Sequence, residues 1–322
     1  MKNICIVGYG NIGLVHAEAL KDIENASVYA VCDTDEKRLN AAKTDLKSKL
    51  YSDFEKCLED EKIDYFHICT PHYLHFEMIK KVLEKGKIAV VEKPHVMKRE
   101  QMDVLLSKYD TKRIIPIFQN RENECVKKMK NLTENRTDFG KLICAKGILT
   151  WSRDADYYNS APWRGTKKYE GGSALINQAI HTLDIMSYFC GGATDAQSSF
   201  SNHSLKGVIE TEDTVEAYIT YKNGVKGIFY ATNAYLVSSS MDVELVFENA
   251  ILRYMGGSLY LNGEKICTDK EGHLGKLGYG RGHRDVFYNL YQKNIHLCFE
   301  DVKNTLDAMF KIYECQNKEG DF

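Results

Sequence analysis

Short apolar runs alternate with amphipathic stretches over residues 4–119 of the chain. Apolar runs of this length, bounded by turn residues, are typical of strands that are buried on both faces. The predicted strands are Ile4–Val7, Val28–Cys32, Tyr65–Thr70, Ile88–Val91 and Arg113–Gln119. The predicted helices between them are Leu14–Ile23, Tyr73–Lys85 and Glu100–Lys108. Strands that alternate with helices predict a parallel, doubly wound sheet, and Pro116 places the last strand near an edge.

Beyond residue 121 the pattern changes to strands in which apolar and polar side chains alternate. Thr214–Tyr221 and Met241–Phe247 alternate in this way, and Asn223-Gly224 predicts a hairpin turn into a returning strand at Val225–Thr232. Further strands are predicted at Leu142–Trp151, Ile251–Met255 and Leu259–Leu261, and closing helices at Arg284–Phe299 and Val302–Gln316. Several strands are apolar on both faces, so another subunit is expected to cover the second face of the sheet.

The two patterns predict an α/β chain of two domains. Residues 1–121 are expected to form the doubly wound parallel sheet. Residues 122–322 are expected to form an α+β domain with a large, mostly antiparallel open sheet and helices on one face. A chain of 322 residues is long enough to bury a sizeable core in each domain.

A glycine-rich turn joins the first predicted strand to the first predicted helix. Gly8, Gly10 and Gly13 follow the spacing G-x-G-x-x-G, and Asp33 stands at the end of the next predicted strand. In this setting Gly8 permits the tight turn, Gly10 lets backbone approach a pyrophosphate, and Gly13 lets helix pack on strand. The N-terminus of the helix offers N–H groups to the phosphates, and Asp33 accepts hydrogen bonds from a ribose. The sequence therefore predicts a Rossmann-type dinucleotide-binding domain.

The residues after the second strand bear on the choice of dinucleotide. Asp33 and Asp35 would repel a 2′-phosphate, and Arg38, the nearest cation, lies about a helical turn farther on. We therefore expect NAD in preference to NADP.

Composition and charge argue against several other classes of protein. The 43 basic and 45 acidic residues give a net charge of -2, so neither nucleic acid nor an anionic membrane is an expected partner. The ten cysteines show no C-x-x-C spacing, which argues against structural zinc and a disulfide framework and suits a reducing compartment. The first strand begins too early for a signal peptide, and no apolar run approaches the roughly 20 residues that span a bilayer. We expect a cytoplasmic protein with a small-molecule substrate.

A polar stripe on a later helix carries candidate chemistry. Paired glycines precede a helix that is predicted from Ser173 to about Phe189, with Ser173 as its N-cap. Asn177, His181 and Asp184 are spaced i, i+4 and i+7, so they are expected to share one face of this helix. A polar stripe on an otherwise apolar helix either lines a cleft or meets buried polar partners.

Lys93 is the second candidate, because it follows the carboxyl end of a predicted strand. Ligands of open α/β sheets bind outside the carboxyl ends of their strands, so the ammonium is expected to point toward a ligand. A solvated surface lysine is the alternative interpretation. Pro94 fixes the backbone immediately after it.

These segments resemble, in order and spacing, the glucose-fructose oxidoreductase/inositol dehydrogenase/MocA family. The resemblance is carried by Gly8–Gly13, Thr70–His75, Glu92–Pro94, Phe118–Arg121 and Gly171–Asp184. It implies an N-terminal Rossmann domain, a C-terminal domain with a large open sheet, and a homodimer or homotetramer built through that sheet. It also implies an NAD(P)-dependent oxidoreductase that acts on a secondary alcohol of a sugar, inositol or sugar derivative.

The resemblance further implies roles for individual residues. Lys93, His181 and Asn177 are the expected catalytic residues: the lysine contacts the substrate hydroxyl and the nicotinamide, and the histidine accepts the proton. The expected cofactor-binding residues are Gly8, Gly10, Asn11, Ile12, Gly13, Asp33, Thr70, Pro71, His72, His75, Glu92 and Lys93. The expected substrate-binding residues are Asn120, Arg121, Tyr157, Trp163, Arg164, Asn177, His181 and His283, and no metal site is expected.

Two departures from the family pattern leave alternatives open. His72 stands where asparagine is common, and Asn177 stands where many members have an aspartate that ionises. The alternatives to a dehydrogenase are an NAD-dependent glycosidase on the same fold and a non-catalytic nucleotide-binding sensor. Arg121, Arg153 and Arg164 are each candidates to bind an anionic substituent of the substrate or to form surface ion pairs.

Overall fold

The computed structural model describes residues 1–270 and 282–316, and the chain divides into two compact units. The first unit contains Met1–Gln119 and Gly282–Val302, and the second contains Asn120–Arg281 and Lys303–Phe322. The expected boundary at residues 121 and 122 lies next to the break after Gln119. The segment 282–302, which was expected in the second domain, instead packs with the first unit. Residues 271–281 and 317–322 of the expected second domain lie outside the described residues.

The first unit is built on a six-stranded parallel sheet with the order β3-β2-β1-β4-β5-β6. The strands are β1 (Lys2–Val7), β2 (Ala26–Cys32), β3 (Lys49–Tyr51), β4 (Tyr65–Ile68), β5 (Ile88–Val91) and β6 (Ile114–Pro116). This order confirms the predicted doubly wound sheet, and β6 with Pro116 lies at an edge as expected. β3 was not predicted, because three residues are too few to show a period.

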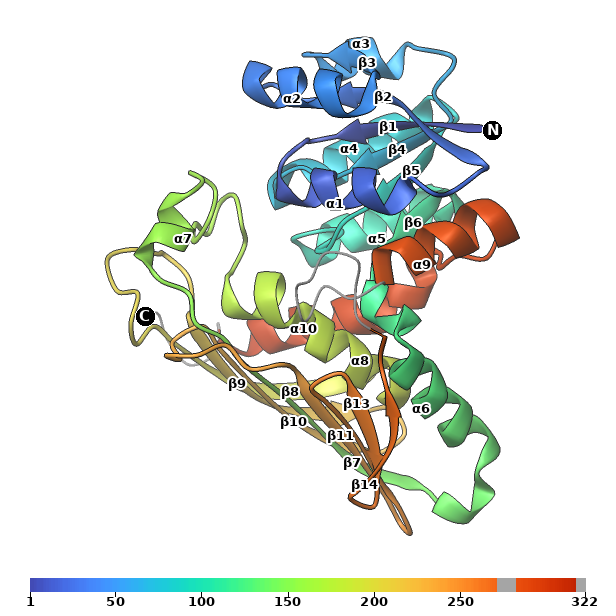
Figure 1. The fold of residues 1–322 in the computed structure, drawn as a ribbon. Helices are drawn as coiled ribbons and strands as arrows, with labels where there is room; N and C mark the ends of the chain where they lie inside the picture. Colours follow the sequence, from blue (N-terminus) through green and yellow to red (C-terminus); the bar gives the residue numbers. More distant parts are fainter. Residues whose placement is uncertain (271–281, 317–322) are drawn as a thin grey trace. The chain divides into compact units, whose positions relative to one another are not determined.

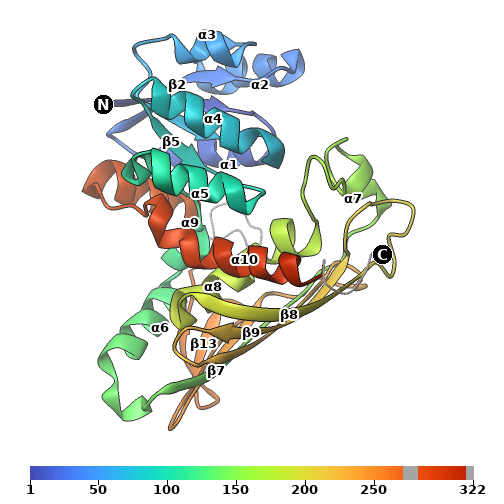
Figure 2. The same cartoon turned by 180° about the vertical axis from the view of Figure 1, so that it is seen from behind.

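Helices cover both faces of this sheet. They are α1 (Asn11–Leu20), α2 (Glu36–Leu46), α3 (Phe54–Leu58), α4 (His72–Glu84), α5 (Arg99–Lys108) and α9 (Gly282–Tyr288), with a short turn η1 (Thr111–Arg113). Figure 1 shows α1 in front of the sheet, and turning the view by 180° brings α4 and α5 to the front (Figure 2).

The predicted helix Arg284–Phe299 is wrong in its second half. α9 ends at Tyr288 and continues as a π-turn, η5 (Asn289–Lys293). Asn294 then adopts a left-handed conformation (φ 55°), which ends the helical path, and a short turn η6 (Phe299–Val302) follows. Phe287, Leu290 and Tyr291 join the apolar core beside Ile4 and Ile6, which explains why this late segment belongs to the first unit.

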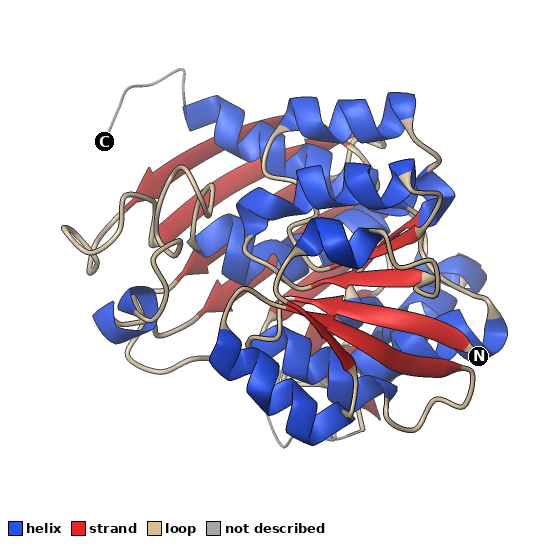
Figure 3. Ribbon diagram, turned by 90° about the horizontal axis from the view of Figure 1, so that it is seen from above, coloured by secondary structure: helices blue, strands red, loops and turns tan. Residues whose placement is uncertain are grey.

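The second unit is built on an eight-stranded sheet with the order β14-β13-β12-β11-β7-β10-β9-β8. Its strands are β7 (Leu142–Thr150), β8 (Ala193–Ser201), β9 (Thr214–Tyr221), β10 (Lys226–Thr232), β11 (Asp242–Phe247), β12 (Ile251–Met255), β13 (Ser258–Leu261) and β14 (Glu264–Thr268). Neighbouring strands are antiparallel except for β7 and β10, which confirms the mostly antiparallel open sheet. Coloured by secondary structure, the strands fall into two separate sheets (Figure 3).

Three helices of the second unit pack on one face of its sheet: α6 (Glu124–Asn135), α8 (Ile180–Cys190) and α10 (Lys303–Gln316). The unit also contains the short helix α7 (Ala155–Asn159), the turns η2 (Gln119–Glu122) and η3 (Thr137–Phe139) and a π-turn, η4 (Ala174–Ala179). α8 packs against β7, and α10 against β8 (Figure 1). Val215 and Ile219 of β9 are buried on this side, whereas Tyr218 is exposed on the other. No helix in the described part of the chain has the length and apolar character to cross a membrane.

Candidate functional site

The glycine turn after β1 has the shape that a pyrophosphate requires. Gly8 has a φ of 91°, and a Cβ there would lie 2.7 Å from the carbonyl oxygen of Cys69. A Cβ on Gly13 would lie 2.1 Å from the carbonyl oxygen of Gly8, so α1 can approach β1 only with glycine at this position. A Cβ on Gly10 would meet nothing closer than the Arg38 guanidinium at 3.8 Å, so backbone is open to approach there. Because the first N–H groups of a helix have no partner within it, the start of α1 is suited to phosphate oxygens.

Asp33, at the end of β2, is held in a fixed orientation. Its carboxylate accepts hydrogen bonds from the backbone N–H of Tyr9 (2.7 Å) and of Asp35 (2.9 Å). Arg38 lies 3.5 Å from the Asp33 carboxylate and 3.7 Å from that of Asp35. The charge of the nearest cation is therefore shared between two aspartates.

His75 links two loops at the carboxyl ends of neighbouring strands. Its Nδ1 lies 2.8 Å from the carbonyl oxygen of Pro94, and its Nε2 lies 2.7 Å from the carbonyl oxygen of Thr70. Burial lowers the pKa of His75, and the two carbonyl contacts oppose that effect. The imidazole ties the loop after β4, where Pro71 precedes α4, to the turn that carries Lys93.

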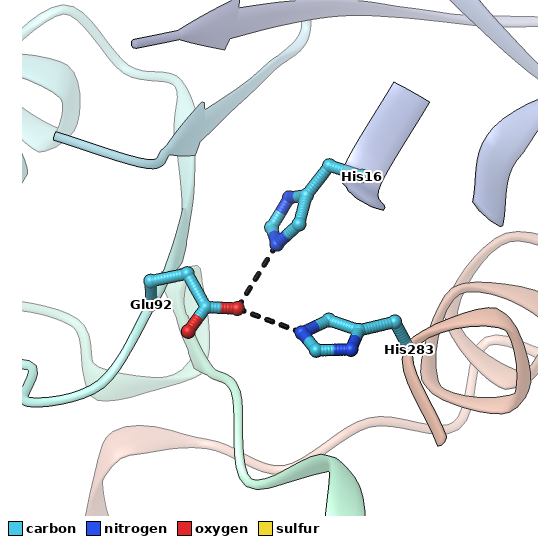
Figure 4. Close-up of side chains that lie close together, drawn as sticks. All are labelled: His16, Glu92 and His283. Atoms are coloured by element: carbon cyan, nitrogen blue, oxygen red, sulfur yellow. Dashed lines mark hydrogen bonds and ion pairs between the residues drawn. The ribbon is translucent and has the colours of Figure 1, made fainter. Parts of the chain in front are cut away.

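Glu92, the last residue before Lys93, is the centre of a buried network in the first unit. Its Oε1 atom accepts from His16 Nε2 on α1 (3.0 Å) and from His283 Nε2 on α9 (2.9 Å) (Figure 4). Its Oε2 atom accepts from the backbone N–H of Lys93 at 3.2 Å. Burial alone would raise the pKa of Glu92, but the two histidine contacts outweigh it and hold the pKa well below the usual range.

The network extends from His16 to two more side chains. His16 Nδ1 lies 2.9 Å from His67 Nδ1, and His67 Nε2 lies 2.7 Å from the Tyr291 hydroxyl. Burial lowers the pKa of both His16 and His67, which favours neutral rings. If both rings are neutral, one placement of the protons gives each of the three contacts one donor and one acceptor. Tyr291 then donates to His67, His67 donates to His16, and His16 donates to Glu92. The chain of contacts fixes the backbone at Lys93 from the interior.

His16, Glu92 and His283 also have the chemistry of metal ligands. Their ligand atoms all lie within 4.8 Å of one another, and two histidines with one carboxylate are a known donor set for transition metals. Both Nε2 atoms, however, face the same carboxylate oxygen at hydrogen-bond distance (Figure 4). This geometry is that of two N–H donors on one acceptor.

The second unit holds Asn177 in a π-turn and not in a regular helix. η4 precedes α8, and a π-turn rotates the residues that follow away from their α-helical positions. Asn177 Nδ2 donates to Glu170 Oε1 at 2.5 Å. Asp184 is bound by Arg121 instead, at 2.6 and 2.9 Å, and by the Thr305 hydroxyl at 2.8 Å. His181 and Asp184 share one face of α8, and Asn177 lies in the π-turn directly before it. The predicted polar residues thus meet different buried partners.

The predicted N-cap at Ser173 is also corrected. The Ser173 side chain makes no capping hydrogen bond, and its hydroxyl instead contacts that of Tyr158 at 2.5 Å. The backbone N–H groups at the start of this segment are instead bound by a buried carboxylate. Glu212 Oε1 accepts from the N–H of Ser173 (2.9 Å) and from that of Leu175 (3.1 Å). The Tyr313 hydroxyl donates to the same oxygen at 2.9 Å.

Glu170 is the second buried carboxyl of this region. It also accepts a hydrogen bond from the backbone N–H of Gly165. Burial raises its pKa to about 7, although these contacts and the nearby Arg164 oppose the rise. A carboxyl that titrates near neutrality thus contacts Asn177 directly.

Two of the residues expected to bind substrate make buried contacts within their own units. Arg121 is 8 % exposed, and its guanidinium is paired with Asp184. His283 lies buried in the Glu92 network of the first unit. Lys93 follows β5 in the first unit and His181 lies in α8 of the second, and both are half-buried.

The remaining predicted residues lie in helices and turns of the two units. The backbone of Asn11 and Ile12 belongs to the first turn of α1, and His72, 5 % exposed, begins α4. Asn120 is buried in η2. Tyr157, Trp163 and Arg164 lie in the second unit, where the Tyr157 hydroxyl accepts from Gln178 Nε2 at 2.7 Å.

The buried partners of these sites were not predicted from the sequence: His16, His67, Tyr291, Glu170 and Glu212. One signal was present, because His67 is a histidine within the otherwise apolar and aromatic strand β4. Such residues are rare in buried strands unless a polar partner meets them.

The fold and the glycine turn define a Rossmann-type dinucleotide-binding protein with a second sheet domain. Residues 2–115 match the family model described as "Oxidoreductase family, NAD-binding Rossmann fold", and residues 126–253 match the "GFO/IDH/MocA C-terminal domain". The chain belongs to the GFO/IDH/MocA oxidoreductase family.

Named relatives support this placement. Myo-inositol 2-dehydrogenase of Thermotoga maritima is 28 % identical over 235 residues, covering 70 % of this chain and 66 % of the relative. The scyllo-inositol 2-dehydrogenase (NAD(+)) of Bacillus subtilis is 29 % identical over 220 residues, covering 67 % of this chain and 62 % of the relative. The matches thus span about two thirds of the length of these relatives.

Solved structures share the fold over nearly the whole chain. The WlbA dehydrogenase of Bordetella pertussis, in complex with NADH and UDP-GlcNAcA, gives a TM-score of 0.87 at 22 % identity and covers 99 % of this chain and 96 % of that one. Levoglucosan dehydrogenase in complex with NADH gives 0.84 at 20 % identity, covering 99 % and 98 %. At these identities the likeness shows the fold alone.

Proposed function

We propose that this protein is an NAD-dependent oxidoreductase that acts on a secondary alcohol of a sugar, inositol or sugar derivative. The observation that carries the proposal is the glycine turn. Gly8 and Gly13 are required by close backbone contacts, whereas Gly10 is free of such contacts and faces the start of α1. That combination suits a bound pyrophosphate and is not needed for folding alone. The names of relatives in the family support the class of substrate.

The chemistry assigned to the chain is a proton transfer with charge stabilisation. When bound, NAD supplies the acceptor for the hydride. His181 takes the hydroxyl proton, since an imidazole titrates near neutral pH. Lys93 stabilises the negative charge that develops on the same oxygen. Glu170 fixes the amide of Asn177, so that the Asn177 oxygen is oriented as an acceptor.

Replacement of Lys93 tests the proposal. NADH formation is measured against inositols, aldoses, amino sugars and sugar acids, for the wild type and for Lys93→Ala. The variant is expected to lose at least about a hundredfold in kcat while it binds NAD normally, because the lysine acts on the transition state. Lys108→Ala, which removes an exposed lysine of α5, is the matched control and should keep full activity.

Three results would point elsewhere. Unchanged turnover in Lys93→Ala would remove the lysine from the mechanism. Cleavage of a glycoside without accumulation of NADH would identify an NAD-dependent glycosidase. NAD binding without turnover of any compound would favour the sensor.

We also propose that NAD is preferred over NADP. Asp33 is fixed by two backbone N–H groups, and Arg38 is already near two carboxylates, so a 2′-phosphate would find repulsion and no spare cation. Wild-type protein should bind NADH at least about tenfold more tightly than NADPH in equilibrium titrations. Asp33→Ser should narrow that ratio, whereas equal affinities in the wild type would contradict the proposal.

The assembly is the third proposal. We infer that the chain forms a homodimer or homotetramer through the face of the second sheet that the helices of that unit leave uncovered. Tyr218 and Ile228 are 43 % and 58 % exposed on that face.

A further inference from the structure

Two arginines of the second unit are held by aromatic rings. The Arg153 guanidinium carbon lies 4.6 Å from the centre of the Trp151 ring and 4.7 Å from that of Tyr157. The Arg164 guanidinium carbon lies 4.2 Å from the centre of Tyr157 and 5.0 Å from that of Trp163. We call these five residues the arginine–tyrosine stack. Stacking on rings holds a guanidinium plane in place without using its hydrogen-bond donors.

Neither arginine has a carboxylate within ion-pair distance among the residues that the structure describes. Within residues 1–270 and 282–316, the Arg153 side chain makes one hydrogen bond, from Nη1 to the carbonyl oxygen of Ser152 (2.9 Å). The Nε atoms of both arginines are buried without an acceptor in the described part of the chain. Buried donors of a charged group are usually satisfied, so two such cases in one cluster call for an explanation.

Other arginines of the same unit behave differently. Arg121 is paired with Asp184 (2.6 Å), Arg136 with Asp138 (2.6 Å) and Arg253 with Asp242 (2.8 Å). The contrast shows that the second unit supplies carboxylates to its structural arginines.

Two acidic side chains that are close in sequence to the two arginines, Asp154 and Glu170, are engaged elsewhere. Asp154, next to Arg153 in sequence, accepts from the backbone N–H of Tyr157 (2.9 Å) and caps α7. Glu170 attracts Arg164 electrostatically, but its oxygens accept from Gly165 and Asn177. The two guanidinium groups therefore stand over one ring with their charges uncompensated by any direct pair, an arrangement that an anion would stabilise.

The stack contains three of the residues expected to bind substrate, Tyr157, Trp163 and Arg164, and it contacts the turn that holds Asn177. The Tyr157 hydroxyl accepts from Gln178 Nε2 at 2.7 Å, and Gln178 follows Asn177 in η4. The hydrogen bond between Gln178 and Tyr157 thus connects the arginine–tyrosine stack directly to the π-turn that contains Asn177.

We propose that Arg153 and Arg164 form an anion-binding subsite, and that the substrate is a sugar derivative carrying a carboxylate or a phosphate. Each guanidinium presents donors in a fork that matches either group. The inference rests on the proposed function and narrows its substrate class from sugars, inositols and sugar derivatives in general to acidic sugars.

Matched pairs of sugars test the inference. NADH formation is measured for D-glucuronate against D-glucose, D-galacturonate against D-galactose, and D-glucose 6-phosphate, so that carboxylate and phosphate are separate arms. The best substrate is expected to be acidic. Arg153→Gln and Arg164→Gln should each raise its KM by about ten- to a hundredfold, since each removes a charge-assisted contact, with little change in kcat. Lys167→Gln, which removes an exposed cation of the same segment, is the control and should leave KM unchanged.

Variants that keep the positive charge test whether the planar guanidinium is needed. Arg153→Lys and Arg164→Lys keep the charge but not the planar fork, and each should show an intermediate KM if the variants to glutamine are folded. A neutral sugar as the best substrate, or an acidic one whose KM is the same in all variants, would overturn the inference and leave the dehydrogenase standing.

If no sugar is turned over, the anion-binding subsite is tested by calorimetric titration of the NADH-loaded protein with D-glucuronate and with inorganic phosphate. Binding that is lost in the Arg153→Gln/Arg164→Gln double variant would keep the subsite and reject the dehydrogenase. Absence of such binding would reject the subsite as well.

Discussion

At the scale of single residues, the buried carboxyl of Glu170 makes the stability of the folded chain depend on pH. Burial raises its pKa from 4.5 to about 7, with Glu212 adding to the rise and Arg164 opposing it. Between these two pH values the folded chain holds a proton that the unfolded chain has released. The contribution of Glu170 to the free energy of unfolding therefore falls as the pH rises from about 4.5 to about 7, by on the order of 3 kcal/mol at most.

Glu170→Gln tests this sign. The amide cannot ionise, so the variant should gain stability relative to the wild type between pH 5 and pH 8, by up to about 3 kcal/mol. Urea denaturation of both proteins at the two pH values measures the difference. Glu216→Gln, an exposed position on β9, is the control and should show no such trend. A stability difference for Glu170→Gln that does not change with pH would mean that the carboxyl is ionised throughout.

At the scale of elements, the turn between β1 and α1 contains two glycines that are needed for different reasons, Gly13 for packing and Gly10 for space beside the backbone. Gly13→Ala would place a Cβ 2.1 Å from the carbonyl oxygen of Gly8, so the helix must move, at a cost of about 3 kcal/mol. Gly10→Ala would meet its nearest atom at 3.8 Å, so stability should change by less than about 1 kcal/mol.

NADH titration distinguishes the two variants. Gly10→Ala should keep the wild-type melting temperature but bind NADH at least about tenfold more weakly, because its methyl group occupies the space left for the pyrophosphate. Gly13→Ala should lose both stability and binding. Wild-type affinity in Gly10→Ala would show that the open space at Gly10 has no role in binding.

The same elements show what a sequence can predict. Thr214–Tyr221 and Ile251–Met255 were predicted with the bounds of β9 and β12, because alternation reveals a half-buried strand directly. β8 (Ala193–Ser201) was missed, since its side chains are mostly polar or small and a register shift interrupts its pairing with β9. Alternation is visible only where apolar side chains mark the buried face.

The candidate site was predictable only in part, for a related reason. The glycine spacing and Asp33 follow from local backbone requirements, and the sequence contains them. Partners that are distant in the sequence, such as Glu92 with His283 or Glu212 with Ser173, depend on tertiary packing. The π-turn η4 replaces the first turns of the regular helix that was predicted from Ser173, and no residue type is specific to such a turn.

At the scale of the molecule, the chain leaves the first unit after Gln119 and returns to it at Gly282. Helical periodicity indicated an apolar face on the segment 284–299 but not the surface that it covers. Phe287, Leu290 and Tyr291 pack into the core of the first sheet, and His283 completes the Glu92 network. The returning segment thus contributes to the first unit both apolar surface and a buried histidine.

The uncovered face of the second sheet leads to the last prediction, on assembly. Tyr218 and Ile228 face each other directly across β9 and β10, and Ile251 on β12 is 42 % exposed. Arg253 and Asp242 form an ion pair in the same sheet (2.8 Å). A mixture of exposed apolar side chains with paired charges is typical of subunit interfaces.

Charge placed in the middle of this face should separate the subunits. Tyr218→Lys/Ile228→Lys would bring like charges together in an interface between identical copies, so light scattering after gel filtration should report a dimer or tetramer for the wild type and a monomer for the variant. Ile295→Lys, at a position that is 61 % exposed in the first unit, controls for added charge and should keep the wild-type mass. The melting temperature of the wild type should also rise with protein concentration, since association stabilises the folded chain by mass action, and that dependence should vanish in the double variant. A wild-type protein that is monomeric at all concentrations would mean that this apolar face is not used for self-association.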